Sequence, residues 1–154
     1  MEYYKNSAGT GIDISKDAIL NTKTNLSNYN LINRIKLLRK NIFTYRTDKK
    51  FDLIISNPPY LKLSDYINLD LGIKKYEPKE ALIGDNKEGL RFYKEIIKKF
   101  KNNIKLNGYF AFEIGDNQFM QINKLLILNG FIVVSKYKLI NNQIRCMLAK
   151  KIKN

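Results

Sequence analysis

Ten residues decide the fold class of this chain: FDLIISNPPY, residues 51–60. The first six form a mainly apolar run that predicts a buried β-strand, and Asn57-Pro58-Pro59 ends it. Ligands in open α/β sheets bind beyond the carboxyl ends of the strands. We therefore expect residues 57–60 to border the functional site.

The segments around this stretch alternate between strand and helix patterns. The expected elements are strands over 9–14, 35–38 and 51–56, a turn-rich connection over 61–87, helices over 18–29, 90–105 and 117–128, a strand over 109–114 and closing strands over 131–137 and 144–149. The alternation predicts an α/β fold with a mostly parallel sheet. A length of 154 residues suits one domain over 1–154.

The composition restricts the chemistry. The chain has no histidine, which excludes Ser-His and Cys-His nucleophile pairs and the usual zinc sites, and we expect no metal. Its one cysteine, Cys146, cannot form a disulfide within the chain. Catalysis would depend on carboxylates, amides, backbone groups or a cofactor.

The charge is strongly positive, with 28 Lys and Arg against 14 Asp and Glu, a formal net of +14. This balance permits proximity to nucleic acid or the ribosome. Most basic residues are lysines, however, and we interpret clusters such as 98–101 and 150–153 as solvated. No signal peptide or apolar run of membrane-spanning length precedes or interrupts these segments, so we expect a cytoplasmic location without membrane contact.

The NPPY turn suits one chemical problem, the orientation of a planar, weakly nucleophilic nitrogen. Two prolines fix φ and lack backbone N–H groups, and Asn57 before them is restricted to the extended region. The side-chain oxygen of Asn57 and the carbonyl of Pro58 could then accept hydrogen bonds from one NH2 group, with Tyr60 beside its plane. Asn57, Pro58 and Tyr60 are the candidate catalytic residues. A rigid turn without a catalytic role is the alternative.

A second candidate position is Asp13, the acidic residue that closes the first expected strand. Carboxylates there commonly accept hydrogen bonds from the ribose hydroxyls of a nucleoside cofactor. A favourable charge at the start of the next helix is the alternative. Asn41, just past the strand over 35–38, could contact an adenine edge.

Together, four segments resemble the HemK/PrmC family: GIDISKDA at 11–18, FDLIISNPPY at 51–60, YEPKEAL at 76–82 and FEIG at 112–115 with Gln118. That family consists of class I, S-adenosylmethionine-dependent methyltransferases that methylate a glutamine side-chain amide in peptide chain release factors. The NPPY motif alone is shared with DNA adenine and RNA guanine methyltransferases. The two segments that follow it narrow the resemblance to the glutamine-methylating branch.

The resemblance implies a Rossmann-like class I methyltransferase sheet, mostly parallel with an antiparallel closing strand. It also implies S-adenosyl-L-methionine as methyl donor, with Asp13 on its ribose and Asn41 and Ile42 beside its adenine. Glu113 has no chemical role in this scheme.

The same resemblance implies a release factor as partner and substrate. Asn57, Pro58, Pro59 and Tyr60 would bind its glutamine amide, and Asn57 would lie between donor and substrate. Glu77, with the proline after it, would shape a flap over that pocket.

The chain departs from the family pattern at its start. The family has a strand and a glycine-rich loop before the Asp13 strand, and a separate N-terminal helical domain. Here Gly9-Thr10-Gly11 holds the only glycine pair before Ile12, without a third glycine. We expect an N-terminally truncated domain. The strands over 9–14 and 51–56 would then pair directly, use the N-terminal residues, or receive the missing strand from another polypeptide.

Three functions remain open at this point. The first is protein-glutamine methyl transfer to a release factor, and the second is amino methylation of adenine or guanine in nucleic acid. The third is a truncated remnant that binds a partner without turnover.

Overall fold

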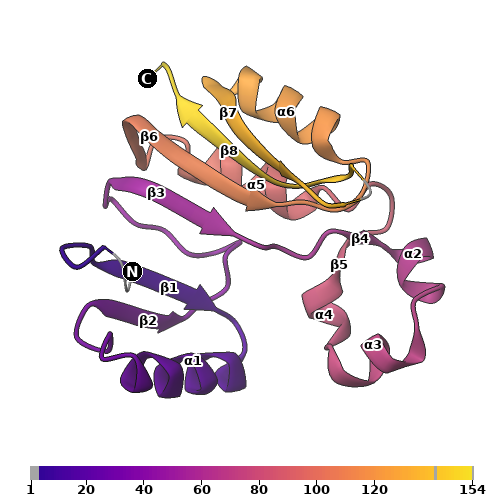
Figure 1. Cartoon of the computed structure of the whole chain (residues 1–154), viewed down its shortest axis with the longest axis horizontal. Coiled ribbons are helices and arrows are strands. Elements are labelled where there is room, and N and C mark those ends of the chain that lie inside the picture. Colours follow the sequence, from indigo (N-terminus) through magenta and orange to yellow (C-terminus); the bar gives the residue numbers. More distant parts are fainter. Residues whose placement is uncertain (1–3, 141, 154) are drawn as a thin grey trace. The chain divides into compact units, whose positions relative to one another are not determined.

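The structure is a computed structural model that describes residues 4–140 and 142–153. Contacts between Cα atoms divide the chain into two compact units, Met1–Thr47 and Asp48–Asn154. Figure 1 labels their elements along the chain, and each unit is described here by itself.

The N-terminal unit is a strand–helix–strand crossover. Its elements are β1 (Gly9–Asp13), α1 (Lys16–Asn28) and β2 (Ile35–Arg39). The two strands pair in parallel, as expected for strands joined by a helix. The helix begins where the hydroxyl oxygen of Ser15 accepts a hydrogen bond from the Ala18 N–H at 3.2 Å. This unit therefore carries the carboxyl ends of two adjacent strands.

The C-terminal unit contains a four-stranded sheet in the order β3-β6-β8-β7. Its strands are β3 (Phe51–Ser56), β6 (Ile104–Glu113), β7 (Phe131–Lys138) and β8 (Ile144–Lys151). The β3–β6 pair is parallel, whereas β8 is antiparallel to both of its neighbours. The expected α/β sheet with an antiparallel closing strand is confirmed.

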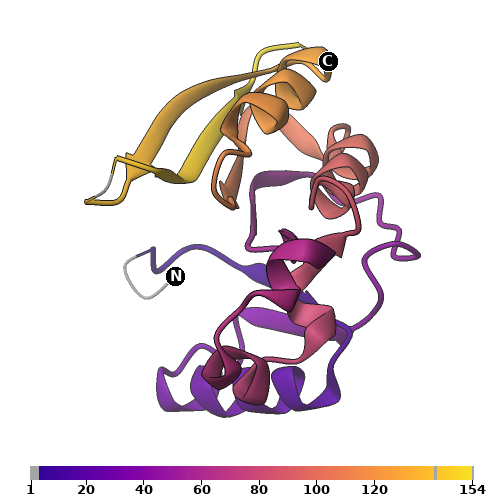
Figure 2. The same cartoon turned by 90° about the vertical axis from the view of Figure 1, so that its right-hand side faces the viewer.

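Two helices, α5 (Arg91–Phe100) and α6 (Phe119–Leu128), cover one face of this sheet (Figure 2). Phe110 and Phe112 of β6 are buried beneath them, with ring centroids 5.2 Å apart. Tyr93 of α5 packs edge-on against Phe112 at 5.5 Å, and its hydroxyl donates to the carbonyl of Glu113 at 2.7 Å. Buried aromatic contacts of this kind dominate core energetics. They fix the carboxyl end of β6 against α5, while strand pairing places it next to the end of β3.

The connection over 61–87 is not the turn-rich loop expected from its composition. It contains β4 (Leu61–Lys62), α2 (Leu63–Ile67), α3 (Leu71–Tyr76), α4 (Lys79–Leu82) and β5 (Ile83–Asp85). β4 and β5 pair in parallel, so the two ends of the segment over 63–82 lie side by side. We call this segment the flap. Its helices have only four to six residues and are too short for apolar periodicity to reveal them.

The helix expected over 90–105 is also shorter than predicted. α5 ends at Phe100, Ile104 begins β6, and Asn107-Gly108 lies inside that strand instead of ending the helix. Asn107 has a positive φ of 65°, and β6 bulges where the partner of Phe51 is Ile104 but the partner of Leu53 is Tyr109. The buried Ile104 matches helical spacing by coincidence.

One of the lysines interpreted as solvated is buried. Lys151 is 4% exposed, and its ammonium group donates to the carbonyls of Lys101 and Ile104, each at 3.0 Å. Burial lowers the pKa of Lys151. The ammonium satisfies carbonyls that follow the C-terminal end of α5, so this residue ties β8 to that helix.

The glycines that precede Ile12 do not form a loop, because they belong to a strand. Gly9-Thr10-Gly11 lies within β1 as extended strand, opposite residues 35–37 of β2.

A single carboxylate, that of Asp85, organises the loop between β5 and α5. Its Oδ1 accepts hydrogen bonds from the backbone N–H groups of Lys87, Glu88 and Gly89 at 2.7–3.0 Å, and its Oδ2 accepts those of Leu90 and Arg91 at 2.8 and 3.0 Å. Burial alone would raise the pKa of Asp85, but these donors outweigh it and hold the pKa far below its usual range.

Asp85→Asn is expected to lower the free energy of unfolding by about 1.5–3 kcal/mol at pH 7, because an amide cannot accept from donors on both sides. The pKa of Asp85 is depressed in the folded state, so its contribution is complete above the unfolded pKa of about 4 and is lost as the pH falls further. Urea unfolding from pH 7 to pH 3 measures the difference between wild type and variant, which should shrink only below about pH 4.

Asp52→Asn is the matched control. Asp52 pairs with Lys105 at 2.8 Å on the surface, so its loss should change stability little. Equal effects of the two substitutions would contradict the role given to Asp85.

Candidate functional site

The NPPY turn follows β3 directly. Ser56, the last residue of β3, pairs with Phe112, so the turn begins beside the end of β6. Asn57 is exposed, Pro58 is buried, and Pro59 and Tyr60 are half-buried. The turn thus exposes its first residue while its prolines and Tyr60 pack against the protein.

Three glycines line the packed side of this turn. A Cβ atom on Gly84 would lie 2.8 Å from the carbonyl oxygen of Pro59, and one on Gly115 would lie 2.7 Å from Cδ2 of Tyr60. A Cβ atom on Gly89, which has a φ of +70°, would overlap the Tyr60 carbonyl. We call these residues the glycine cradle. Residues 84 and 89 had no role in the sequence analysis; the Asp85-to-Gly89 spacing was the available turn signal.

Gln118 holds the backbone of the turn. Its Nε2 donates to the carbonyls of Tyr60 and Glu88, each at 2.9 Å, and its Oε1 accepts from the Gly115 N–H at 3.0 Å. The side chain is buried and all of its polar atoms are engaged. Satisfied buried amides of this kind specify one local geometry.

Arg145 holds the side chain of Tyr60. Its guanidinium donates to the Tyr60 hydroxyl, pairs with Oε1 of Glu113 at 2.8 Å, and places Cζ 5.0 Å over the Tyr60 ring. Burial would lower the pKa of Arg145, but Tyr60 and Glu113 outweigh it and raise that pKa. The arginine therefore stays charged. Glu113, without a chemical role in the sequence analysis, orients this guanidinium.

Two acceptors of the turn remain available. Within residues 4–140 and 142–153, neither the side-chain amide of Asn57 nor the carbonyl of Pro58 has a hydrogen-bond partner. Tyr60, by contrast, is fixed at its carbonyl and its hydroxyl. The turn is held rigidly by one end while the other can bind a ligand.

Asp13 and Asn41 lie at the carboxyl ends of adjacent strands in the N-terminal unit. The Lys40 N–H donates to the carbonyl of Asp13 at 2.9 Å, which brings the start of the 40–42 segment beside the end of β1. Oδ1 of Asp13 accepts from the Ser15 N–H at 2.8 Å, and Oδ1 of Asn41 accepts from the Phe43 N–H at 2.9 Å. Oδ2 of Asp13 and the NH2 group of Asn41 are left for a ligand with hydroxyl and acceptor groups. This donor set fits a nucleoside.

Glu77 lies between α3 and α4, at the far end of the flap from the β4–β5 ladder. The residue is exposed, and its backbone N–H donates to the carbonyl of Ile73 at 2.9 Å. Pro78 is the N-cap residue of α4. Both therefore lie within residues 63–82, and their role over the substrate pocket stays a prediction.

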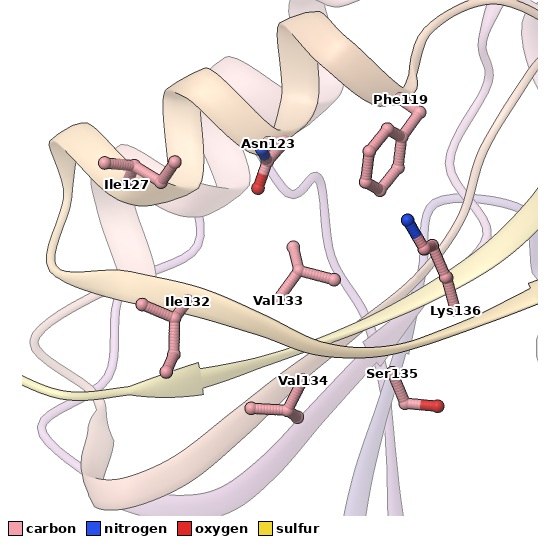
Figure 3. Close-up of a pocket in the computed structure, with 8 residues that line it drawn as sticks. All are labelled: Phe119, Asn123, Ile127, Ile132, Val133, Val134, Ser135 and Lys136. Carbon is pink, nitrogen blue, oxygen red and sulfur yellow. The ribbon is translucent and has the colours of Figure 1, made fainter.

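A separate hollow lies between α6 and β7 (Figure 3). Phe119, Asn123 and Ile127 face Val133 and Lys136 across it, and the Lys136 ammonium stands 5.0 Å over the Phe119 ring. It contains none of the predicted site residues. In the described part of the chain there is no cluster of metal-ligating side chains, and no helix is long and apolar enough to cross a bilayer.

Comparisons with known proteins find methyltransferases. A family model described as an RMKL-like methyltransferase domain matches residues 2–65. A release factor glutamine methyltransferase of Fusobacterium nucleatum is 41% identical over 150 residues, which cover 96% of this chain. The chain is homologous to this methyltransferase. A second release factor glutamine methyltransferase, from Clostridium botulinum, is 39% identical over 132 residues and 84% of this chain.

The chain spans less than half the length of these relatives, 41% of the first and 46% of the second. A bifunctional methyltransferase of Rickettsia bellii is 34% identical over 83% of this chain and 23% of its own length.

Solved structures show the fold. A methyltransferase from Pyrococcus furiosus matches with a TM-score of 0.67 at 17% identity, over 99% of this chain and 66% of its own. TrmN from Thermus thermophilus matches with a TM-score of 0.63 at 13% identity, over 95% of this chain and 37% of its own. The class I methyltransferase fold implied by the sequence is confirmed.

Proposed function

We propose that this chain transfers a methyl group from S-adenosyl-L-methionine to the side-chain amide nitrogen of a glutamine in a peptide chain release factor. The observation that carries the proposal is the NPPY turn, which is held at Tyr60 and leaves the Asn57 amide and the Pro58 carbonyl unpaired. The names of the 41% and 39% identical relatives support the substrate. The two units are proposed to act as one methyltransferase domain.

The donor, when bound, supplies an electrophilic methyl carbon on a sulfonium. The chain's own part is to bind and orient. Asn57 Oδ1 and the Pro58 carbonyl each accept a hydrogen bond from one N–H of the glutamine NH2 group, and the Tyr60 ring lies against the amide plane. Pro59 keeps the turn in one conformation.

Hydrogen bonds to both N–H groups orient the amide nitrogen so that its lone pair is less delocalised into the carbonyl and points toward the methyl carbon. With the donor bound, an N–C bond would form as the C–S bond breaks and leaves its electron pair on sulfur, and the substrate nitrogen would then lose one proton to solvent. No side chain has to remove that proton before attack, which agrees with a chain without histidine.

Asp13, Asn41 and Ile42 are proposed to bind the donor. A ribose hydroxyl donates to Oδ2 of Asp13, Asn41 donates from its NH2 group to the adenine, and Ile42 packs on the base. Glu77 is proposed to act from the flap on the bound peptide.

The test is methyl transfer from labelled donor to a purified release factor, with mass spectrometry to locate the label. Label on a glutamine amide is the expected result. Label on an oligonucleotide instead would identify the enzyme as a nucleic-acid amino methyltransferase, which its charge of +14 would suit. No heat on calorimetric titration with millimolar donor would indicate a remnant without turnover.

Asp13→Ala is expected to weaken donor binding by about 1–3 kcal/mol, or roughly 5- to 150-fold, because a charged acceptor is lost. Isothermal titration calorimetry of the whole chain measures this. Asp17→Ala is the matched control, since Asp17 lies in the first turn of α1 and has no proposed ligand. Unchanged affinity in Asp13→Ala would leave this carboxylate only its hydrogen bond to the Ser15 N–H.

A further inference from the structure

Tyr60 is fixed more firmly than a turn residue requires. Gln118 binds its carbonyl at 2.9 Å, Arg145 donates to its hydroxyl, and Gly115 lies so close to its ring edge that a Cβ atom would be 2.7 Å from Cδ2. Backbone and hydroxyl are thus held by separate hydrogen bonds, and the missing side chain of Gly115 leaves room for the ring edge.

Arg145 makes the contact that determines the ring plane. The residue lies in β8 beside Cys146, whose partner in β6 is Glu113, so the arginine and the glutamate extend from neighbouring strands. One guanidinium nitrogen, Nη2, reaches both the Glu113 carboxylate and the Tyr60 hydroxyl, and its two N–H groups can serve one partner each. With Cζ 5.0 Å over the ring, it also covers one aromatic face.

We propose that Arg145, oriented by Glu113, is a positioning residue that fixes the Tyr60 ring so that the face opposite the guanidinium receives the planar group of the substrate. This inference rests on the proposed function. With one face occupied by a cation, the ring offers a planar amide a single stacking surface. Holding that surface in place before the substrate arrives spares the ordering cost on binding.

A purely structural role for the Glu113–Arg145 pair has different consequences. Such a pair would only join the ends of β6 and β8, so its loss would change stability and leave the kinetics of the folded protein unchanged. A positioning role changes the Tyr60 ring and the KM for the substrate while donor affinity stays constant.

The deciding variant is Arg145→Lys in the whole chain. Lysine keeps the charge but has no planar guanidinium, so it cannot place a flat cation over the ring while one nitrogen contacts Glu113 and Tyr60. Two readouts are needed: the NMR signals of 13C-labelled tyrosine rings, with Tyr60 assigned by its loss in Tyr60→Phe, and steady-state kinetics with the release factor.

In Arg145→Lys we expect a changed Tyr60 ring signal, a KM for the release factor raised roughly tenfold, and an unchanged Kd for the donor. Glu113→Gln should move both readouts in the same direction by less. Combining Arg145→Lys with Tyr60→Ala should raise KM no further than Tyr60→Ala alone, because the arginine acts through that ring.

Arg91→Lys is the matched control, an exposed arginine at the start of α5 that should leave both readouts unchanged. An unchanged Tyr60 signal in Arg145→Lys would overturn the inference, and so would a changed signal with unaltered KM. If the wild-type chain methylates no release factor, the proposed function fails, and the Tyr60 signal then decides alone whether Arg145 fixes the ring.

Discussion

Asn57→Ala is expected to lower kcat for methyl transfer by about 100-fold or more while the protein remains folded. The substitution removes one of the two acceptors that would hold the substrate NH2 group, and loss of a positioned partner of the reacting group costs about that factor in other enzymes. Asn57 is exposed and its side chain has no partner among the described residues, so stability should change by less than about 0.5 kcal/mol.

Two further variants make this result specific. Asn57→Asp keeps an oxygen acceptor in the same place and should retain more activity than Asn57→Ala. Asn102→Ala removes an exposed asparagine after α5, near the amino end of β3, and should retain full activity. Single-turnover measurement with saturating donor separates the chemical step from binding. Full activity in Asn57→Ala would show that the acceptor pair is wrongly assigned.

Gly89→Ala is expected to destabilise the protein by about 3–5 kcal/mol. The new methyl group would overlap the Tyr60 carbonyl and crowd Nε2 of Gln118, and a φ of +70° is itself unfavourable for alanine. Relief requires the turn to move away from Gln118, so transfer activity should fall further than the folded fraction does. Urea unfolding and activity per folded molecule measure the two effects.

Gly130→Ala separates the cost of steric overlap with Tyr60 from the cost of a positive φ. Gly130 also has a positive φ, of 84°, but its nearest neighbour for a Cβ atom is the carbonyl oxygen of Lys153 at 3.3 Å. We expect it to cost only about 1–2 kcal/mol and to leave activity intact. If the two substitutions cost the same, the glycine cradle is not what positions Tyr60.

Local signals predicted the strands well. The strand over 51–56 has the expected bounds because prolines stop an apolar run, and both effects lie within ten residues. The expected burial of this strand is wrong, because β3 is an edge strand of its sheet, with Leu53 44% and Ile55 73% exposed. The predicted C-terminal end of the helix over 90–105 is wrong because Ile104 fits both the apolar spacing of a helix and the burial of a strand. Only its pairing with Phe51 decides that it belongs to a strand. The flap helices are too short for periodicity to detect.

Local chemistry predicted the NPPY turn equally well but not what holds it. The two prolines restrict the turn by themselves, whereas the hydrogen bonds of Gln118 and Arg145 to Tyr60 span 58 and 85 residues. The resemblance included Gln118 without assigning it a role, and Arg145 had no role in the sequence-based predictions. Asp85 and Gly89 read as an ordinary polar turn, since their importance depends on the carbonyl of Tyr60 lying against them. The burial of Lys151 likewise depends on the distant end of α5.

Tyr60 and Arg145 are 85 residues apart in the sequence, so Tyr60 leaves the ribosome well before the arginine that binds it. A nascent chain that has emerged from the ribosome only as far as α6 already has the motif, but β8 and its guanidinium are still inside the exit tunnel. Contacts this distant in sequence close late during folding. The binding geometry around Tyr60 is therefore complete only after β8 has left the exit tunnel.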